Sequence, residues 1–415
     1  MVDSVEVWLW LLLVMHPHKP KTTALVDHYG SATEAARAMR DGRCTILSES
    51  EKQRVKRTRT REVRELMDEC AANGIRIITL SDPEYPALLA NIDNPPIVLF
   101  VMGSLSGLND EVTVAGIGTR SASQYGIAAT EKICTELVSA KTVLVSGLAL
   151  GIDTAVHRCA VSGGVRTIGV LACGCLVNYP PENSELKKQI VEQGGALVSE
   201  LLPHAEVSAG YFKERNRIIS GLALGTIIFE AASVSGCMLT AQHCLRQGRE
   251  LFCVPPHDIM SEHFSGVVEY LRDGAVPVFS HIDVINRLGL NYAKSLKTPR
   301  LRMKIQNDPF TFRSTAKRSR KQIKEDPSAR EEQPEPLPEL PAQPEPAAAL
   351  PPEELYASLE PTEASVLRMI AEKPRTIDEL IEANESSHAE MATVLMDLEI
   401  FGHIALQPDG TYSLP

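Results

Sequence analysis

A glycine-rich turn at residues 116–126 is the strongest chemical signal in the sequence. It reads Gly-Ile-Gly-Thr-Arg-Ser-Ala-Ser-Gln-Tyr-Gly and joins an apolar segment to a helical pattern. Glycines at such a turn let backbone amides approach an anion, and the helix N-terminus adds partial positive charge. A dinucleotide site would need glycine where Ser121 stands and an acidic residue near Ser146, at the end of the next strand. Because Arg120 suits a phosphate better than a ribose hydroxyl, the turn predicts a phosphate site and disfavours a nicotinamide cofactor.

A second glycine-rich turn, Ser146-Gly-Leu-Ala-Leu-Gly-Ile-Asp153, follows the next apolar segment. In a parallel sheet the two turns lie side by side at the carboxyl edge, where open α/β folds bind ligands. This pairing is more specific than either turn alone. Asp153 stands at a helix start, and its favoured role is to cap that helix.

A third segment, residues 211–221, mixes basic and aromatic side chains in the order Tyr-Phe-Lys-Glu-Arg-Asn-Arg-Ile-Ile-Ser-Gly. Such a pattern can hold a sugar-phosphate backbone while a ring stacks on a base. The alternative is that Phe212 packs in the core and one arginine pairs with Glu230. We expect a mixture, in which one arginine is structural and another is exposed.

The sequence offers no pattern for a nucleophile, a general base or a metal. Gly-x-Ser-x-Gly, His-Glu-x-x-His and a Walker lysine are absent, and His157 and His204 have no evident partners. The nine cysteines lack Cys-x-x-Cys spacing, which is typical of buried free thiols in a reducing compartment. Cys173 and Cys175 have no nearby histidine or cysteine to complete a zinc site, so we expect no metal and no other cofactor.

Seven short apolar segments between residues 111 and 280 alternate with helical patterns. Their nearly continuous apolar character is expected of strands buried on both faces of a parallel sheet. The alternation predicts a doubly wound, mostly parallel α/β fold over residues 105–290. The strands are expected at residues 111–118, 142–147, 166–173, 196–200, 226–231, 250–255 and 275–280.

Residues 1–100 carry helical periodicity and predict a small N-terminal helical domain. Its apolar run, residues 8–15, is shorter than the ~20 residues of a membrane span and follows an acidic start, so we expect a buried helix in a cytoplasmic protein. Residues 52–61 hold six lysines and arginines and no acidic residue. A solvated helix face is favoured there over a phosphate-contacting patch. The chain's net charge of −11 excludes a protein that coats nucleic acid by bulk positive charge.

Residues 291–354 are predicted to be a linker. Its first part, residues 294–324, holds eleven lysines and arginines against one acidic residue. An electrostatic arm for DNA and a merely solvated segment are both open interpretations. Residues 325–354 are acidic and rich in proline, which predicts an extended, semi-rigid spacer.

Residues 355–415 predict a winged helix. Thr-x-x-Glu at 376–379 and Ser-x-x-Glu at 387–390 are capping boxes for its second and third helices, and Asp-Gly at 409–410 predicts the turn of the wing. The domain has three basic and eleven acidic residues, and its presumed recognition helix has no lysine or arginine. Since a helix that reads duplex DNA needs cations near phosphates, a protein-docking role is favoured.

Read in order, these motifs resemble the DNA-processing protein A family (DprA, also called Smf). The resemblance covers residues 110–280 almost continuously, and the flanking domains resemble the family's arrangement more weakly. Two segments depart from the pattern. Residues 260–270 keep only Gly266 of an Asn-Pro-x-Ser-Arg-Gly-like loop, and residues 15–20 lack the glycines of a helix-hairpin-helix. The matching motifs lie at residues 114–126, 145–153, 179–183, 195–200, 212–222, 230–241, 247–255 and 271–275.

The resemblance implies an extended Rossmann-like core in a recombination mediator that is not an enzyme. Such a protein binds and protects single-stranded DNA, forms homodimers and helps load the RecA recombinase, as in natural transformation. An alternative is a phosphoribohydrolase-like nucleotide-processing enzyme with Glu230 as a catalytic carboxylate, and a third is a scaffold that acts through its winged helix alone. The DNA-binding residues that the motifs imply are Gly118, Thr119, Arg120, Ser123, Gly147, Phe212, Lys213, Arg215, Asn216 and Arg217.

Overall fold

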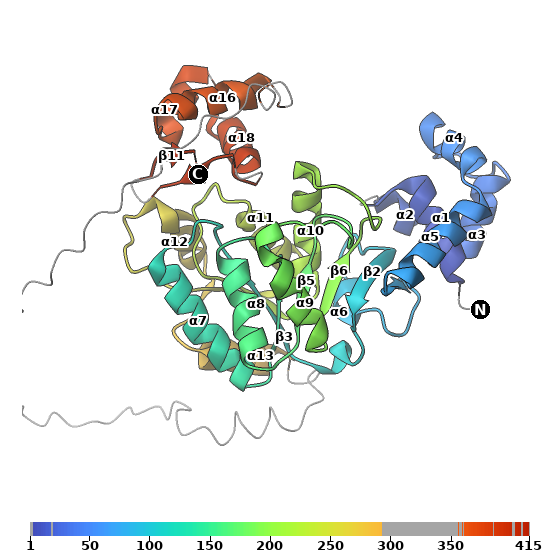
Figure 1. The fold of residues 1–415 in the computed structure, drawn as a ribbon, viewed down its shortest axis with the longest axis horizontal. Helices are drawn as coiled ribbons and strands as arrows, with labels where there is room; N and C mark the ends of the chain where they lie inside the picture. Colours follow the sequence, from blue (N-terminus) through green and yellow to red (C-terminus); the bar gives the residue numbers. More distant parts are fainter. Residues whose placement is uncertain are drawn as a thin grey trace, which may run out of the picture.

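A nine-stranded sheet forms the centre of the molecule in the computed structural model (Figure 1). Its order is β1-β2-β6-β5-β4-β3-β7-β8-β9. The structure describes residues 3–17, 20–292, 356, 359, 361–384, 386–400, 403–407 and 410–414. The strands are β1 (Ile75–Thr79), β2 (Val98–Gly103), β3 (Thr113–Ile117), β4 (Val143–Ser146), β5 (Thr167–Val170), β6 (Ala196–Ser199), β7 (Gly225–Ile228), β8 (Glu250–Cys253) and β9 (Val276–Pro277).

Strands β3 to β9 run parallel to one another, which confirms the doubly wound, mostly parallel fold. Strands β1 and β2 are antiparallel additions beside β6 and were not predicted. They lie within residues 1–100, so the assignment of that whole range to a helical domain is corrected: residues 75–103 belong with the sheet. They were missed because β2 pairs with β6, a distant segment of the chain, and β1 pairs only with β2.

Helices cover both faces of the sheet because alternate strand residues point to opposite sides. On β3, Val114 packs with α7 (Gln124–Ser139), α8 (Ile152–Ser162) and α13 (His281–Tyr292). Ala115 and Ile117 face the other side. That second face is covered by α10 (Ala209–Gly221), α11 (Cys237–Arg246), α12 (Ser265–Arg272) and α6 (Ala87–Ala90). Helix α9 (Ser184–Glu192) packs beside α8.

Five N-terminal helices pack at the β1–β2 end of the sheet (Figure 1). The apolar run that was expected to form a buried helix does so within the first of them. No helix among the described residues is both long and apolar enough to cross a membrane. The five are α1 (Val5–Met15), α2 (Pro20–Tyr29), α3 (Ala32–Arg40), α4 (Glu49–Arg57) and α5 (Thr60–Ala72).

The C-terminal domain is a winged helix, as predicted. Both capping boxes form: the amides of Thr376 and Ser387 donate to the carboxylates of Glu379 and Glu390 at 3.1 and 2.9 Å. Residues 293–355, which hold nearly all of the predicted linker, lie outside the described residues. The domain consists of α16 (Pro361–Glu372), α17 (Ile377–Asn384), α18 (His388–Ile400), β10 (Ala405–Leu406) and β11 (Tyr412–Ser413).

Candidate nucleic-acid interface

The two glycine-rich turns lie against each other, as predicted. They follow the neighbouring parallel strands β3 and β4, and the amide of Ile152 donates to the carbonyl of Thr119 at 3.2 Å. Glycine is required for this approach: a Cβ at Gly118 would lie 2.5 Å from Ile152, and one at Gly151, which has a φ of +74°, would lie 2.4 Å from the Arg120 carbonyl oxygen. Strand β3 lies between β4 and β7, so the connections that follow β3 and its neighbours turn to opposite sides of the sheet. In open α/β folds a crevice forms at such a point.

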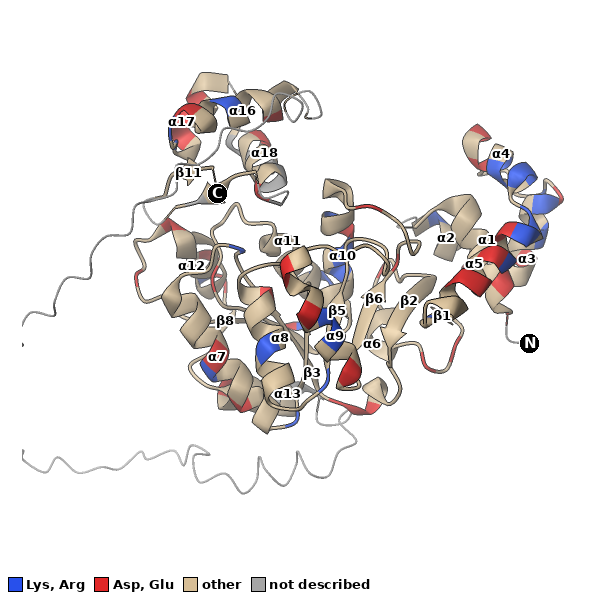
Figure 2. Ribbon diagram, in the orientation of Figure 1, with Lys and Arg blue, Asp and Glu red and all other residues tan. Residues whose placement is uncertain are grey.

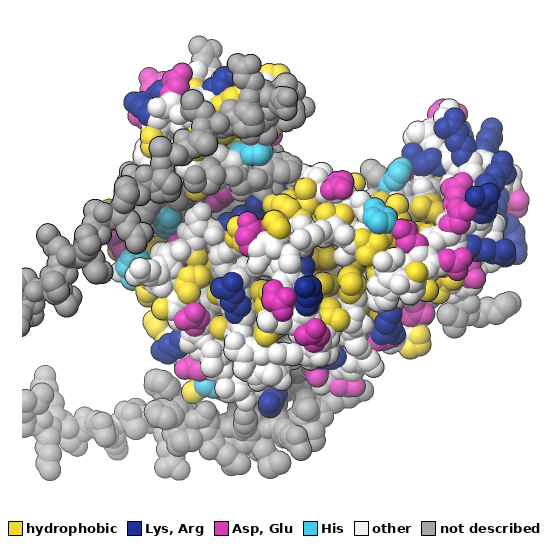
Figure 3. Space-filling model, in the orientation of Figure 1, with side chains coloured by type: hydrophobic (Ala, Val, Ile, Leu, Met, Phe, Trp, Pro, Cys, Tyr) yellow, Lys and Arg dark blue, Asp and Glu magenta, His cyan; other side chains and the backbone are white. Residues whose placement is uncertain are grey.

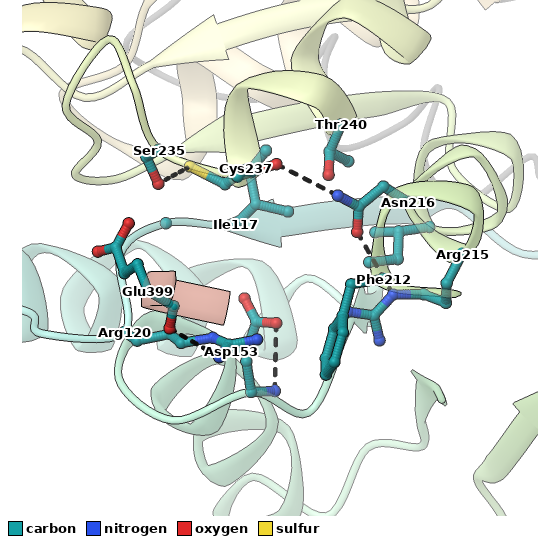
Figure 4. A pocket seen from close by; sticks show the side chains of 14 residues that line it. Ile117, Arg120, Asp153, Phe212, Arg215, Asn216, Ser235, Cys237, Thr240 and Glu399 are labelled. Atoms are coloured by element: carbon teal, nitrogen blue, oxygen red, sulfur yellow. Dashed lines mark hydrogen bonds between the residues drawn. The ribbon is translucent and has the colours of Figure 1, made fainter. Parts of the chain in front are cut away.

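A small cavity of about 60 Å³ lies at this switch point (Figure 4). It is enclosed by the first turn, α8, α10, the start of α11 and the end of α18. Five of the predicted DNA-binding residues line it, namely Gly118, Arg120, Phe212, Arg215 and Asn216.

The cavity contains an aromatic ring between two cations. The guanidinium carbons of Arg120 and Arg215 lie 5.0 and 6.0 Å from the ring centroid of Phe212. Arg215 donates to the carbonyl of Gly147 at 2.7 Å and to that of Val170. Burial lowers the pKa of Arg215 to about 10, so the side chain stays charged at neutral pH. Cations beside a ring are the groups that a phosphate and a stacked base require.

Asp153 holds the second turn rather than capping its own helix. Its carboxylate accepts the amides of Gly147 and Ala149 at 3.1 and 3.3 Å. Burial raises the pKa of Asp153, and the nearby Arg215 opposes that rise. From the neighbouring motif at residues 179–183, the Asn183 amide donates to the Leu148 carbonyl at 2.9 Å. The turn is therefore rigidly held before any ligand binds.

Arg217 has a structural partner that the sequence did not indicate. Its guanidinium forms two hydrogen bonds with the Glu200 carboxylate, at 2.7 and 2.9 Å, and both side chains are 5% exposed. The partner is thus Glu200 and not Glu230. Arg215 is buried as well, so the expectation of an exposed arginine in this segment was wrong. Helical geometry explains the division, because Phe212, Arg215 and Asn216 share a face of α10 from which Lys213 and Arg217 point away.

Ser123 and Glu230 hold the first turn in place through hydrogen bonds. The hydroxyl and amide of Ser123 donate to the Glu230 carboxylate at 2.7 and 3.1 Å. Ser123 also accepts the Gly126 amide at 3.0 Å and so caps α7. His263 lies 3.3 Å from the same carboxylate, whose side chain is fully buried. Thr119 is also buried, with its amide bonded to the Glu230 carbonyl at 2.8 Å.

The sequence analysis missed two sets of side chains that line the cavity. The first set, Ser235, Cys237 and Thr240, comes from the loop after β7 and the start of α11, and the second is Glu399 of α18. The first set could have been found, because that loop follows a third strand at the same sheet edge. Glu399 of the winged helix could not, because nothing in the sequence places that domain over the core.

The comparisons with known proteins agree with this architecture. Residues 76–289, just over half of the chain, match the family model of DNA recombination-mediator protein A. The chain belongs to the DNA-processing protein A family. Residues 341–410 match the model of the DprA winged helix domain.

Individual relatives match between about half and five-sixths of this chain. Protein Smf of Synechocystis is 30% identical over 359 residues, which are 84% of this chain and 82% of that protein. The DNA processing protein DprA of Bacillus subtilis is 35% identical over 215 residues, 52% of this chain and 72% of its own. The X-ray structure of DprA from Streptococcus pneumoniae superposes with a TM-score of 0.61 at 28% identity, covering 69% of this chain and 98% of that one.

Proposed function

We propose that this protein is a recombination mediator that binds single-stranded DNA at the cavity between the two glycine-rich turns. The observation that carries the proposal is the Phe212 ring between the guanidinium groups of Arg120 and Arg215. Phosphates interact with the cations. Binding of this kind depends on the backbone, is largely independent of sequence and weakens as salt is added.

The rest of the proposed role follows from the family. We infer that the protein protects single strands in the cytoplasm, forms a homodimer and helps load RecA, as in natural transformation. Light scattering on the eluting peak tests the dimer, since a monomer at micromolar concentration contradicts it. Stimulation of RecA filament formation on a strand already covered by single-strand-binding protein tests the loading step.

The surroundings of Glu230 favour a DNA-binding mediator over a nucleotide-processing enzyme. That carboxylate is fully buried, is bonded to Ser123 and His263, and does not line the cavity. A catalytic carboxylate must reach the reacting atoms. Release of free base from nucleoside monophosphates would be the activity that supports the enzyme instead.

The decisive experiment is fluorescence anisotropy of a labelled oligo-dT and of a duplex of equal length across a salt series. The wild type is expected to prefer the single strand and to lose affinity with salt. Arg120→Ala should weaken binding and reduce the slope of log K against log salt by about 0.7, the share of one phosphate contact on a single strand. Arg272→Ala removes an exposed charge on α12 and serves as the matched control. No single-strand binding at low salt would overturn the proposal.

A further inference from the structure

The end of helix α18 lies over the candidate DNA site. Arg120 donates to the backbone carbonyl of Glu399 at 3.2 Å, and Glu399 lines the cavity (Figure 4). Carbonyls at a helix C-terminus carry partial negative charge, and the Glu399 side chain adds a carboxylate. The winged helix therefore presents to Arg120 the kind of negative charge that a DNA phosphate would present.

Further contacts fix the winged helix to the loops beside the site. Ala232 and Val234, which follow β7, pack into the apolar cluster of the winged-helix domain. The wing reaches the core as well, because a Cβ at Gly410 would lie 3.1 Å from the Glu262 side chain, and the backbone of Gln407 faces His263. Glu262 and His263 belong to the loop that departs from the family pattern.

In this closed arrangement the site is too small and too well covered for a nucleotide. The cavity measures about 60 Å³, whereas pockets for small molecules usually measure about 300–1,000 Å³. The Phe212 side chain is 5% exposed and packs against Ala172, Tyr179 and Val207 of the core. Arg120 is therefore the group that displacement of the winged helix frees for DNA.

We propose that the winged helix is an intramolecular competitor of single-stranded DNA, which covers Arg120 until it is displaced. The proposal rests on the function proposed above and adds its regulation. The domain has three basic and eleven acidic residues, so its charge repels the same phosphates that the site beneath it attracts. Because the competitor is tethered to the core, its effective concentration stays high at any protein concentration. The apparent DNA affinity is then the affinity of the open form multiplied by the fraction of molecules that are open.

A reversible cross-link tests this directly in the full chain. A Cβ at Gly410 would lie 3.6 Å from the Glu262 Cβ, within the 3.5–4.5 Å that a disulfide needs. The nine native cysteines are free, and eight of them are buried, so Glu262→Cys with Gly410→Cys adds the accessible thiol pair. Anisotropy with oligo-dT is measured on the oxidised protein and again after dithiothreitol. We expect the oxidised form to bind at least about tenfold more weakly, with recovery on reduction.

The outcomes separate this proposal from the proposed function. Equal affinity of the oxidised and reduced forms would overturn the competitor and leave the DNA site intact. No binding by the reduced form or the wild type would overturn the DNA site itself. Failure of the disulfide to form in folded protein would contradict the closed arrangement. Gly410→Cys alone is the control for strain, because Gly410 has a φ of +83°.

A substitution in the competitor gives a second test. Glu399→Gln removes the carboxylate from the cavity and is expected to tighten single-strand binding by the full chain. Glu382→Gln removes one charge from an exposed position on α17 and is the matched control. Equal affinities of the two variants would count against the competitor.

Discussion

At the scale of single residues, burial distinguishes Arg217, whose charge stabilises the fold, from Arg120, whose charge can bind a ligand. The Arg217–Glu200 pair is almost inaccessible to solvent, and each partner satisfies the other through two hydrogen bonds. Removing one member of such a pair leaves an uncompensated buried charge. Arg120 is only half-buried, and it donates a hydrogen bond to another domain.

We expect Arg217→Ala to lower the free energy of unfolding by about 3–5 kcal/mol. Urea denaturation followed by circular dichroism measures the change. Arg158→Ala, at an exposed position on α8, should stay within about 0.5 kcal/mol of the wild type. A loss below about 1 kcal/mol for Arg217→Ala would show that the pair contributes little to stability.

His157 predicts a pH dependence of stability. Its ring is buried, with Nδ1 2.9 Å from the Thr167 hydroxyl, and burial lowers its pKa from 6.5 to about 3. Between pH 6.5 and about pH 3, His157 is protonated in the unfolded chain but not in the folded chain. Stability should therefore fall as pH drops below 6.5, by about 1.4 kcal/mol per pH unit for this group.

Urea unfolding of wild type and His157→Gln between pH 4.5 and 7.5 isolates that contribution. The variant is expected to be less stable at neutral pH but to lose less stability on acidification. Two parallel profiles would mean that His157 binds a proton equally well in both states.

At the scale of elements, the sequence was sufficient for features that depend on neighbours along the chain. The strand-to-helix turns, the seven parallel strands and the capping boxes all follow from local patterns. The antiparallel strands β1 and β2 did not, because β2 pairs with β6, about a hundred residues away, and β1 is added on the far side of β2. The Glu200 partner of Arg217 was missed for the same reason: a turn after β6 brings it to α10 through the topology of the sheet.

The basic strip at residues 52–61 is a second place where DNA phosphates could bind. Lysines and arginines gather on α4 and around the start of α5, well away from the cavity (Figures 2 and 3). We expect them to be a solvated face, so the double variant Arg57→Glu with Arg59→Glu should reduce oligo-dT affinity less than Arg120→Ala does. A larger loss in the same anisotropy assay would make the strip a second phosphate contact.

At the scale of the whole molecule, the arrangement joins a site for anions to an acidic domain that covers it. The sequence showed both parts and the acidity of the second. It could not show that they meet, because the contacts are few and join segments far apart in the sequence, such as Arg120 and Glu399. Such a cover makes DNA binding a competition within one chain.

Amide hydrogen exchange of the full chain with and without oligo-dT tests the central claim most directly. We predict that DNA slows exchange at residues 118–120 and 212–216, which form the site. Exchange should accelerate at residues 403–407 and 410–414, as the wing leaves the core. Unchanged exchange at the two site segments, with protection confined to the helices of residues 49–72, would contradict the account.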